Sequence, residues 1–172
     1  MELQEALSVA LDFERKVRDH YAQSARRTQD PQGHKVFATL AREEQGHVDY
    51  LESRLAEWRA RGEITAAPLT TVLPPVAWIQ AEAGKAAART GASQRPAGAL
   101  PEMDFLKEAL ELEHKTSGFY RSLVAQLASS HRELFARFLE IEDGHVLIVQ
   151  AEIDALAGHG HWFDFMEFSL EQ

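Results

Sequence analysis

The chain has no cysteine, an excess of acidic over basic residues and no long uninterrupted apolar run, and each shortage excludes something. Without cysteine it cannot form disulfides, use a thiol nucleophile, or hold zinc or iron through thiolates. The formal net charge of −9 argues against a nucleic-acid binder, which needs a basic face. No stretch approaches the roughly 18 apolar residues of a membrane span, and the first five residues do not resemble a secretory signal. We therefore expect a cytoplasmic protein that binds neither nucleic acid nor membrane.

The composition of the 172 residues, 45% hydrophobic and 26% charged, suits one domain with a proper core. Apolar residues recur at helical spacing in four long segments and predict an all-α four-helix bundle. The predicted helices span residues 2–28, 32–61, 102–128 and 131–157. Residues 64–101, rich in proline, predict a long crossover between the second and third helices, with a short helix over 76–89. Short links make each pair antiparallel, and we expect the crossover to make the first and third helices parallel.

One chemical pattern occurs twice. Each copy has a Glu and a Tyr spaced E-x6-Y on one helix and an E-x-x-H on the next. The members are Glu14, Tyr21, Glu44 and His47 in the first copy, and Glu113, Tyr120, Glu142 and His145 in the second. The copies are offset by 99 residues for E-x6-Y and by 98 for E-x-x-H, which indicates a duplicated pair of helices. One Glu from each of two helices plus Glu-x-x-His from each of the other two is the ligand set of a dinuclear iron or manganese centre.

Position on the helix separates this pattern from chance, which supplies roughly one E-x-x-H match in a chain of this length. A third match, Glu111 to His114, falls off the apolar stripe that contains Glu113 and is predicted to be a solvated pair. The six repeated Glu and His residues instead interrupt apolar seams. Because an ionised Glu in such a seam costs several kcal/mol unless it is paired, we expect the six side chains to converge on two divalent cations. Carboxylate with imidazole suits iron, manganese or one of each better than structural zinc.

Two further repeated features accompany the predicted ligands. The hydroxyls of Tyr21 and Tyr120 are predicted to hydrogen-bond ligand carboxylates on a facing helix, although each Tyr also fits a role in the core. Gly46 and Gly144 stand in mid-helix, where Gly costs about 1 kcal/mol relative to Ala. The hypothesis is that the missing Cβ gives room to a neighbour near the metals, and the alternative is a remnant of duplication.

The doubled pattern over residues 1–157 resembles the rubrerythrin branch of the ferritin-like superfamily. The resemblance implies a diiron four-helix bundle that reacts with hydrogen peroxide or oxygen and often forms homodimers. It makes Glu44 and Glu142 the bridging ligands and Glu14 and Glu113 the terminal ones, with His47 and His145 completing the set. Rubrerythrins typically carry a rubredoxin module with four cysteines. This chain has none, so it would need a separate electron donor protein.

One departure concerns an additional carboxylate that many rubrerythrins place about one turn from the third-helix ligand. Here positions 110, 116 and 117 are Leu, Thr and Ser, which weakens the case for a ligand-switching peroxidase. The expected function is therefore a non-haem diiron oxidoreductase that reduces peroxide or oxygen while oxidising Fe(II), in oxidative stress or iron handling. The alternatives are a ferroxidase or iron-storage protein, a dimanganese catalase, and a metal-free helical scaffold in which the pattern is a relic.

The C-terminal residues 158–172 form a distinct tail. His159 and His161 flank a Gly, and aromatic residues follow at 162, 163, 165 and 168. We expect these aromatics to cover the end of the bundle or to pack on a partner subunit, in preference to a second metal site.

Overall fold

The computed structural model describes residues 2–65, 67–88, 101–127, 129–163 and 165, and its regular secondary structure over these residues is helical, with no strand. The helices are α1 (Leu3–Arg27), α2 (Pro31–Arg61), α3 (Val76–Ala88), α4 (Pro101–Gln126) and α5 (Ser129–His159). The predicted all-α class is confirmed, and no predicted helix boundary is wrong by more than two residues.

None of the described helices combines the length and the apolar character that crossing a bilayer requires.

The start and the end of α2 are encoded locally. Asp30 caps the helix, because its carboxylate accepts the backbone N–H groups of Gln32 and Gly33, each at 2.8 Å. Pro31 occupies the first turn, where a missing N–H costs nothing. At the other end Gly62 adopts the left-handed conformation with φ of 70°, and its N–H bonds to the carbonyl of Trp58. The signals at the start of α2 keep the link from α1 short, so that α1 and α2 pack as an antiparallel hairpin.

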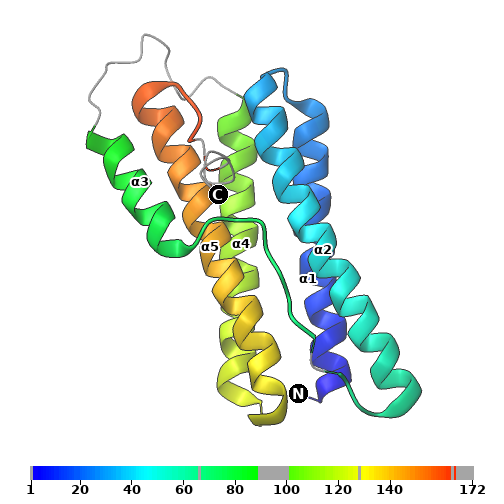
Figure 1. The fold of residues 1–172 in the computed structure, drawn as a ribbon. Coiled ribbons are helices and arrows are strands. Elements are labelled where there is room, and N and C mark those ends of the chain that lie inside the picture. Colours follow the sequence, from blue (N-terminus) through cyan, green and yellow to red (C-terminus); the bar gives the residue numbers. More distant parts are fainter. Residues whose placement is uncertain (1, 66, 89–100, 128, 164, 166–172) are drawn as a thin grey trace.

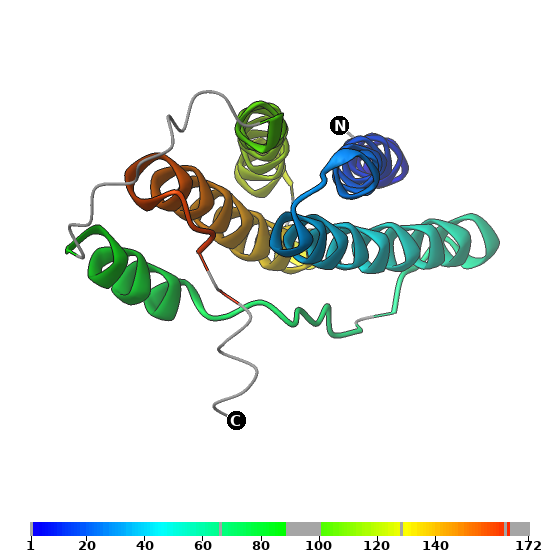
Figure 2. The ribbon, with the colours of Figure 1, turned by 90° about the horizontal axis from the view of Figure 1, so that it is seen from above.

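The four long helices lie side by side, with α1 against α2, α4 against α5, and α1 also against α4 (Figure 1). Seen from above, α1 and α4 form one row and α2 and α5 the other (Figure 2). The prediction that the first and third long helices are parallel is wrong. The His20 ring nitrogen Nε2 lies 2.8 Å from the carbonyl oxygen of Phe105, while Phe13 stacks on Phe119 with ring centroids 4.9 Å apart. Position numbers rise along α1 as they fall along α4, so these helices are antiparallel.

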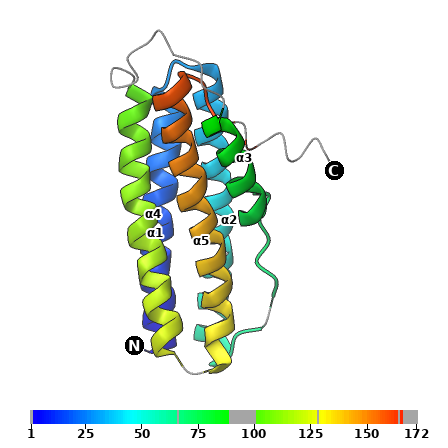
Figure 3. The ribbon, with the colours of Figure 1, turned by 90° about the vertical axis from the view of Figure 1, so that its left-hand side faces the viewer.

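The physical reason lies in the segment after α2. Residues 67–75, here called the strap, turn back along α2, so that the chain reaches α4 at the end of the molecule where α2 began (Figures 1 and 3). Tyr50 donates to the carbonyl of Ala67 at 2.8 Å, and Glu43, two turns earlier on α2, accepts from Thr71 at 2.5 Å. A chain that returns in this way makes α4 parallel to α2 and antiparallel to α1.

The strap and α3 together cover the row formed by α2 and α5 (Figure 2). Arg137 of α5 donates to the carbonyl of Leu69 at 3.3 Å, and α3 packs on α5 through the buried side chain of Ile79. Residues 89–100 of the predicted crossover lie outside the described residues.

The apolar core is divided into two clusters. One lies toward the α1–α2 link and includes Val17, Tyr21, Phe37, Leu106 and Ile148. The other lies toward the α4–α5 link and includes Leu7, Leu51, Tyr120, Leu123 and Phe135. Between them, along each long helix, stand the Glu and His residues of the repeated pattern. The core is therefore two apolar compartments with one polar layer in between.

The aromatic tail covers the end of the first cluster. Trp162 meets Phe37 edge to face with ring centroids 5.7 Å apart, and the backbone N–H of Phe163 donates to Glu152 at 2.7 Å. Phe163 and Phe165 are buried. These residues pack on the end of the bundle, which is one of the two arrangements expected for the tail, whereas Phe168 lies outside the described residues.

Gly33 provides a test of this packing. A Cβ at this position would lie 2.5 Å from Cζ2 of Trp162 and 3.1 Å from the hydroxyl oxygen of Thr28. We expect Gly33→Ala to lower the free energy of unfolding by about 1–3 kcal/mol, because the indole must move. Chemical denaturation followed by circular dichroism measures the stability, and the indole N–H NMR signal assigned to Trp162 reports the environment of that residue among the chain's three tryptophans.

The matched control is Gly46→Ala, at an exposed helix position where a Cβ meets nothing within 4 Å. There the change should raise stability by up to about 1 kcal/mol through helix propensity. Equal effects of the two substitutions would contradict the proposed packing of Trp162 on Gly33.

Candidate metal centre

The structure brings together all six Glu and His residues of the repeated pattern. Glu14 comes from α1, Glu44 and His47 from α2, Glu113 from α4, and Glu142 and His145 from α5, and each is at most 1% exposed. They form two overlapping groups whose ligand atoms lie within 4.8 Å of one another. The first is Glu14, Glu44, His47 and Glu142, and the second is Glu44, Glu113, Glu142 and His145. Glu44 and Glu142 belong to both groups, as bridging ligands between two ions would.

Both imidazoles present Nδ1 to the carboxylates. Nδ1 of His47 lies 3.1 Å from Glu14, 3.3 Å from Glu44 and 3.3 Å from Glu142. Nδ1 of His145 lies 2.7 Å from Glu44 and 3.7 Å from Glu113. The two rings are parallel to within 9°, with centroids 5.4 Å apart. The i, i+3 spacing of each Glu-x-x-His places both side chains on one face of the helix, which explains why α2 and α5 each aim two polar groups inward.

Many of the polar atoms of these six side chains lie close to one another but have no hydrogen-bond partner among the described residues. The buried atoms without such a partner among the described residues include both oxygens of Glu44 and Glu142, Oε2 of Glu113, both ring nitrogens of His145 and Nε2 of His47. Nδ1 of His145 is close to Glu44, yet the angles are not those of a hydrogen bond. A buried polar atom left unpaired costs about 1–3 kcal/mol. Oxygen and nitrogen donors that face one another in this way fit the coordination of divalent metal ions.

The two tyrosines connect the copies of the pattern. The Tyr21 hydroxyl on α1 donates to Glu113 on α4, and the Tyr120 hydroxyl on α4 donates to Glu14 on α1. The predicted hydrogen bonds to carboxylates on a facing helix are therefore confirmed. Glu14 and Glu113 are the carboxylates that belong to only one of the two groups each. Each tyrosine hydrogen bond orients one of them toward the polar layer.

Without metal, the polar layer retains protons. Burial, together with repulsion from Glu142 and Glu44, raises the pKa of Glu14, and burial raises the pKa of Glu113 to about 8. Burial would also raise the pKa of Glu44, but attraction to the two imidazoles outweighs it and lowers that pKa. For His47 and His145, burial favours the neutral ring, yet attraction to Glu44 and its neighbours raises both pKa values. Because metal ligands must be deprotonated, metal binding at neutral pH would release these protons.

Two sequence-based expectations about nearby residues have opposite outcomes. The third E-x-x-H is a surface pair, as predicted, since Glu111 and His114 are exposed. The hypothesis for the mid-helix glycines is wrong: a Cβ would meet nothing within 4 Å at Gly46, and at Gly144 only Cγ2 of Val76, at an ordinary 3.9 Å. Neither glycine makes room for a close neighbour.

Sequence reasoning missed Glu43. This residue is 8% exposed, and its carboxylate forms a third group with His47 and His145, again within 4.8 Å. The available signal was its place directly before Glu44 and four residues before His47, which puts Glu43 beside His47 on the helix surface.

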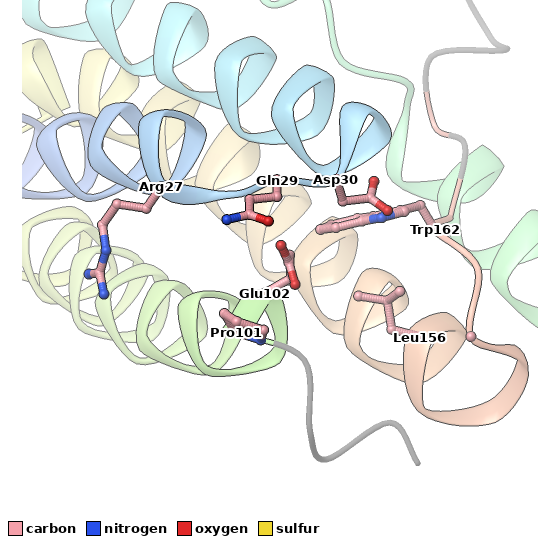
Figure 4. Close-up of a pocket in the computed structure, with 8 residues that line it drawn as sticks. Arg27, Gln29, Asp30, Pro101, Glu102, Leu156 and Trp162 are labelled. Atoms are coloured by element: carbon pink, nitrogen blue, oxygen red, sulfur yellow. The ribbon is translucent and has the colours of Figure 1, made fainter. Parts of the chain in front are cut away.

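A separate cavity of about 470 Å³ lies at the end of the molecule where α2 and α4 begin and α5 ends (Figure 4). Its lining consists of Arg27, Gln29, Asp30, Pro101, Glu102, Leu156, Gly160 and Trp162. The charged groups have structural roles: Asp30 caps α2, Glu102 accepts from Thr28 at 2.6 Å, and Arg27 stacks on Phe105. None of the six converging residues lines it.

Comparison with protein-family models, with curated proteins and with solved structures finds no match to this chain. The resemblance to rubrerythrins therefore stays a prediction that depends on the repeated residues.

The raised pKa values predict how the stability of the metal-free protein depends on pH. The pKa of Glu113 is about 8 in the folded protein, against an ordinary value of 4.5 for an exposed Glu. At any pH between 4.5 and about 8, the folded chain therefore holds a proton that the unfolded chain has lost. Each such proton lowers the free energy of unfolding by about 1.4 kcal/mol for every pH unit of increase. The unfolding temperature, measured in the presence of chelator, should therefore decrease as the pH is raised from about 5.5 to about 8.

The matched variant is Glu113→Gln, which carries no titrating proton. Its unfolding midpoint should fall less steeply over the same pH range, at about 2–4 °C per kcal/mol for a chain of this size. Identical slopes for the two proteins would show that Glu113 ionises normally in the fold.

Proposed function

We propose that the protein is a ferritin-like four-helix bundle whose polar layer holds two iron ions, and that it is a diiron oxidoreductase reducing hydrogen peroxide or oxygen. The observation that carries the proposal is the pair of overlapping groups that share Glu44 and Glu142. Two ions bridged by two carboxylates, each with one further carboxylate and one imidazole, account for every member of both groups.

Charge and donor type support iron or manganese as the metal. Two divalent cations carry the charge that balances four carboxylates, while the imidazoles bind as neutral ligands. The layer contains no thiolate, and its donors are oxygen and nitrogen only. When bound, two Fe(II) ions supply one electron each to the oxidant.

The chain's own residues would do three things. The two tyrosines hold Glu113 and Glu14 in orientation, so that these carboxylates would be placed to bind the ions. The two apolar clusters on either side exclude water from it. Peroxide takes up two electrons and two protons to give two water molecules, and the protons come from solvent or from groups that titrate in the layer. A separate electron donor protein would have to supply the two electrons, because the chain has no cysteine with which to bind an electron-transfer iron.

The decisive experiment is an anaerobic Fe(II) titration of metal-free protein. We expect two tight equivalents per chain, lost in Glu44→Ala/Glu142→Ala because both bridging positions disappear. The control variant, Glu111→Ala/His114→Ala, removes an E-x-x-H on the surface and should bind as the wild type does. Saturable binding also stabilises the fold, by about 2.7 kcal/mol at a hundredfold excess over Kd, so thermal unfolding provides a second readout.

The outcome separates the candidate functions. Two equivalents oxidised stoichiometrically by peroxide and retained by the protein support the peroxidase. Oxygen-driven oxidation of many irons per chain indicates ferroxidase or storage, and oxygen evolution from peroxide by the manganese-loaded protein indicates a catalase. No saturable metal binding by the wild type would leave a metal-free scaffold.

A further inference from the structure

Each imidazole of the polar layer has a second ring nitrogen, Nε2, that does not face the carboxylates and needs a hydrogen-bond partner of its own. Nδ1 of His47 and Nδ1 of His145 face the carboxylates, and Nε2 of each is buried without a hydrogen-bond partner among the described residues. A histidine that binds metal through one nitrogen almost always donates its other N–H to a carboxylate, a carbonyl or water. That second contact sets the tautomer and holds the ring plane. A partner for both Nε2 atoms is therefore expected close by.

Glu43 has the position and the free capacity for this role. It precedes His47 by one helical turn, and its carboxylate lies within 4.8 Å of a ring nitrogen of His47 and of His145. One oxygen accepts the Thr71 hydroxyl at 2.5 Å, and the other accepts the backbone N–H of Val72 at 3.1 Å. A carboxylate has about four acceptor positions, so about two remain.

The second copy of the pattern has no equivalent acid. The residue that corresponds to Glu43 at the offset of 98 is Ile141. This asymmetry is consistent with the geometry, because the two imidazole rings are stacked 5.4 Å apart and a single carboxylate lies within 4.8 Å of a ring nitrogen of each. The strap is likewise present once, and it meets α2 at Glu43.

We propose that Glu43 is a positioning residue for both histidine ligands. When metal is bound, its carboxylate accepts the Nε2–H of His47 and of His145, which leaves the Nδ1 lone pairs to the ions. The strap residues Thr71 and Val72 hold the carboxylate in place, so the strap becomes a structural part of the metal centre. This inference rests on the proposed dinuclear site and extends it to the segment that covers the α2–α5 face.

The test compares metal binding by wild type, Glu43→Gln, Thr71→Val and Glu52→Gln, with Co(II) as the probe. Glu52 is the control, an exposed residue of the same helix that pairs with Arg15 at 2.6 Å. Glu43→Gln should keep two equivalents but weaken their binding about 10–100-fold. Thr71→Val should give a smaller loss, because the carboxylate stays while one of its supports disappears. Glu52→Gln should bind as wild type.

A spectroscopic readout distinguishes positioning from general damage. In the Co(II)-loaded wild type, the two Nε2–H protons should appear as paramagnetically shifted NMR signals that exchange slowly with solvent. In Glu43→Gln these signals should broaden or exchange faster, and in Glu52→Gln they should not change. Thermal unfolding of each metal-free variant shows which of them fold normally. If Glu43→Gln does not fold, the comparison of Thr71→Val with wild type still tests the proposal.

Three results would overturn the proposal in separate ways. Unchanged affinity and unchanged N–H exchange in Glu43→Gln, with two equivalents bound by wild type, would leave the dinuclear site intact and remove the role of Glu43. A third Co(II) equivalent bound by wild type and lost in Glu43→Gln would make Glu43 a ligand instead. No binding by wild type would remove the proposed function itself, and with it the premise.

Discussion

Burying four carboxylates and two imidazoles in one layer is the constraint on which the rest of this structure depends. Each group is at most 1% exposed, and an unpaired buried charge costs several kcal/mol. The metal-free layer reduces that cost by keeping protons on Glu14 and Glu113 and by placing both imidazoles against Glu44. The layer also divides the apolar core in two, so the helices must extend beyond it on both sides to bury enough surface. Helix length and site position are thus parts of one solution.

The two hairpins contribute to the layer through each other. Each tyrosine donates to the carboxylate of the opposite copy, and Glu44 and Glu142 each belong to both groups of converging side chains. The antiparallel contact between α1 and α4 makes these reciprocal hydrogen bonds possible, because it brings Tyr21 level with Glu113 and Tyr120 level with Glu14. The symmetry ends at the α2–α5 face, where Glu43 and the strap occur once.

Much of this arrangement could be predicted from the sequence, for identifiable reasons. Helical periodicity located the helices, and the position of Glu113 relative to Glu111 separated a buried Glu from an exposed one, because burial follows the apolar stripe. Helix direction was predicted wrongly, since it depends on the path of the crossover and not on any local pattern. Glu43 was missed although its place four residues before His47 is a local signal, whereas its contacts with the strap and the contact of Gly33 with Trp162 join segments far apart in the chain. Such contacts leave no periodic signal in the sequence.

In each copy the tyrosine hydrogen-bonds a carboxylate of the other copy, and this reciprocity bears on how such a chain could arise. A hairpin equivalent to α1 and α2 alone would carry half of the converging Glu and His residues and a tyrosine whose acceptor lies elsewhere, so it could complete the layer only by meeting a second copy of itself. Two identical hairpins related by a two-fold axis would make every one of the shared contacts twice. The present chain has the form of such a symmetric dimer joined into one polypeptide, and the joining segment is free to acquire residues, such as those of the strap, that no symmetric ancestor could place on one side only.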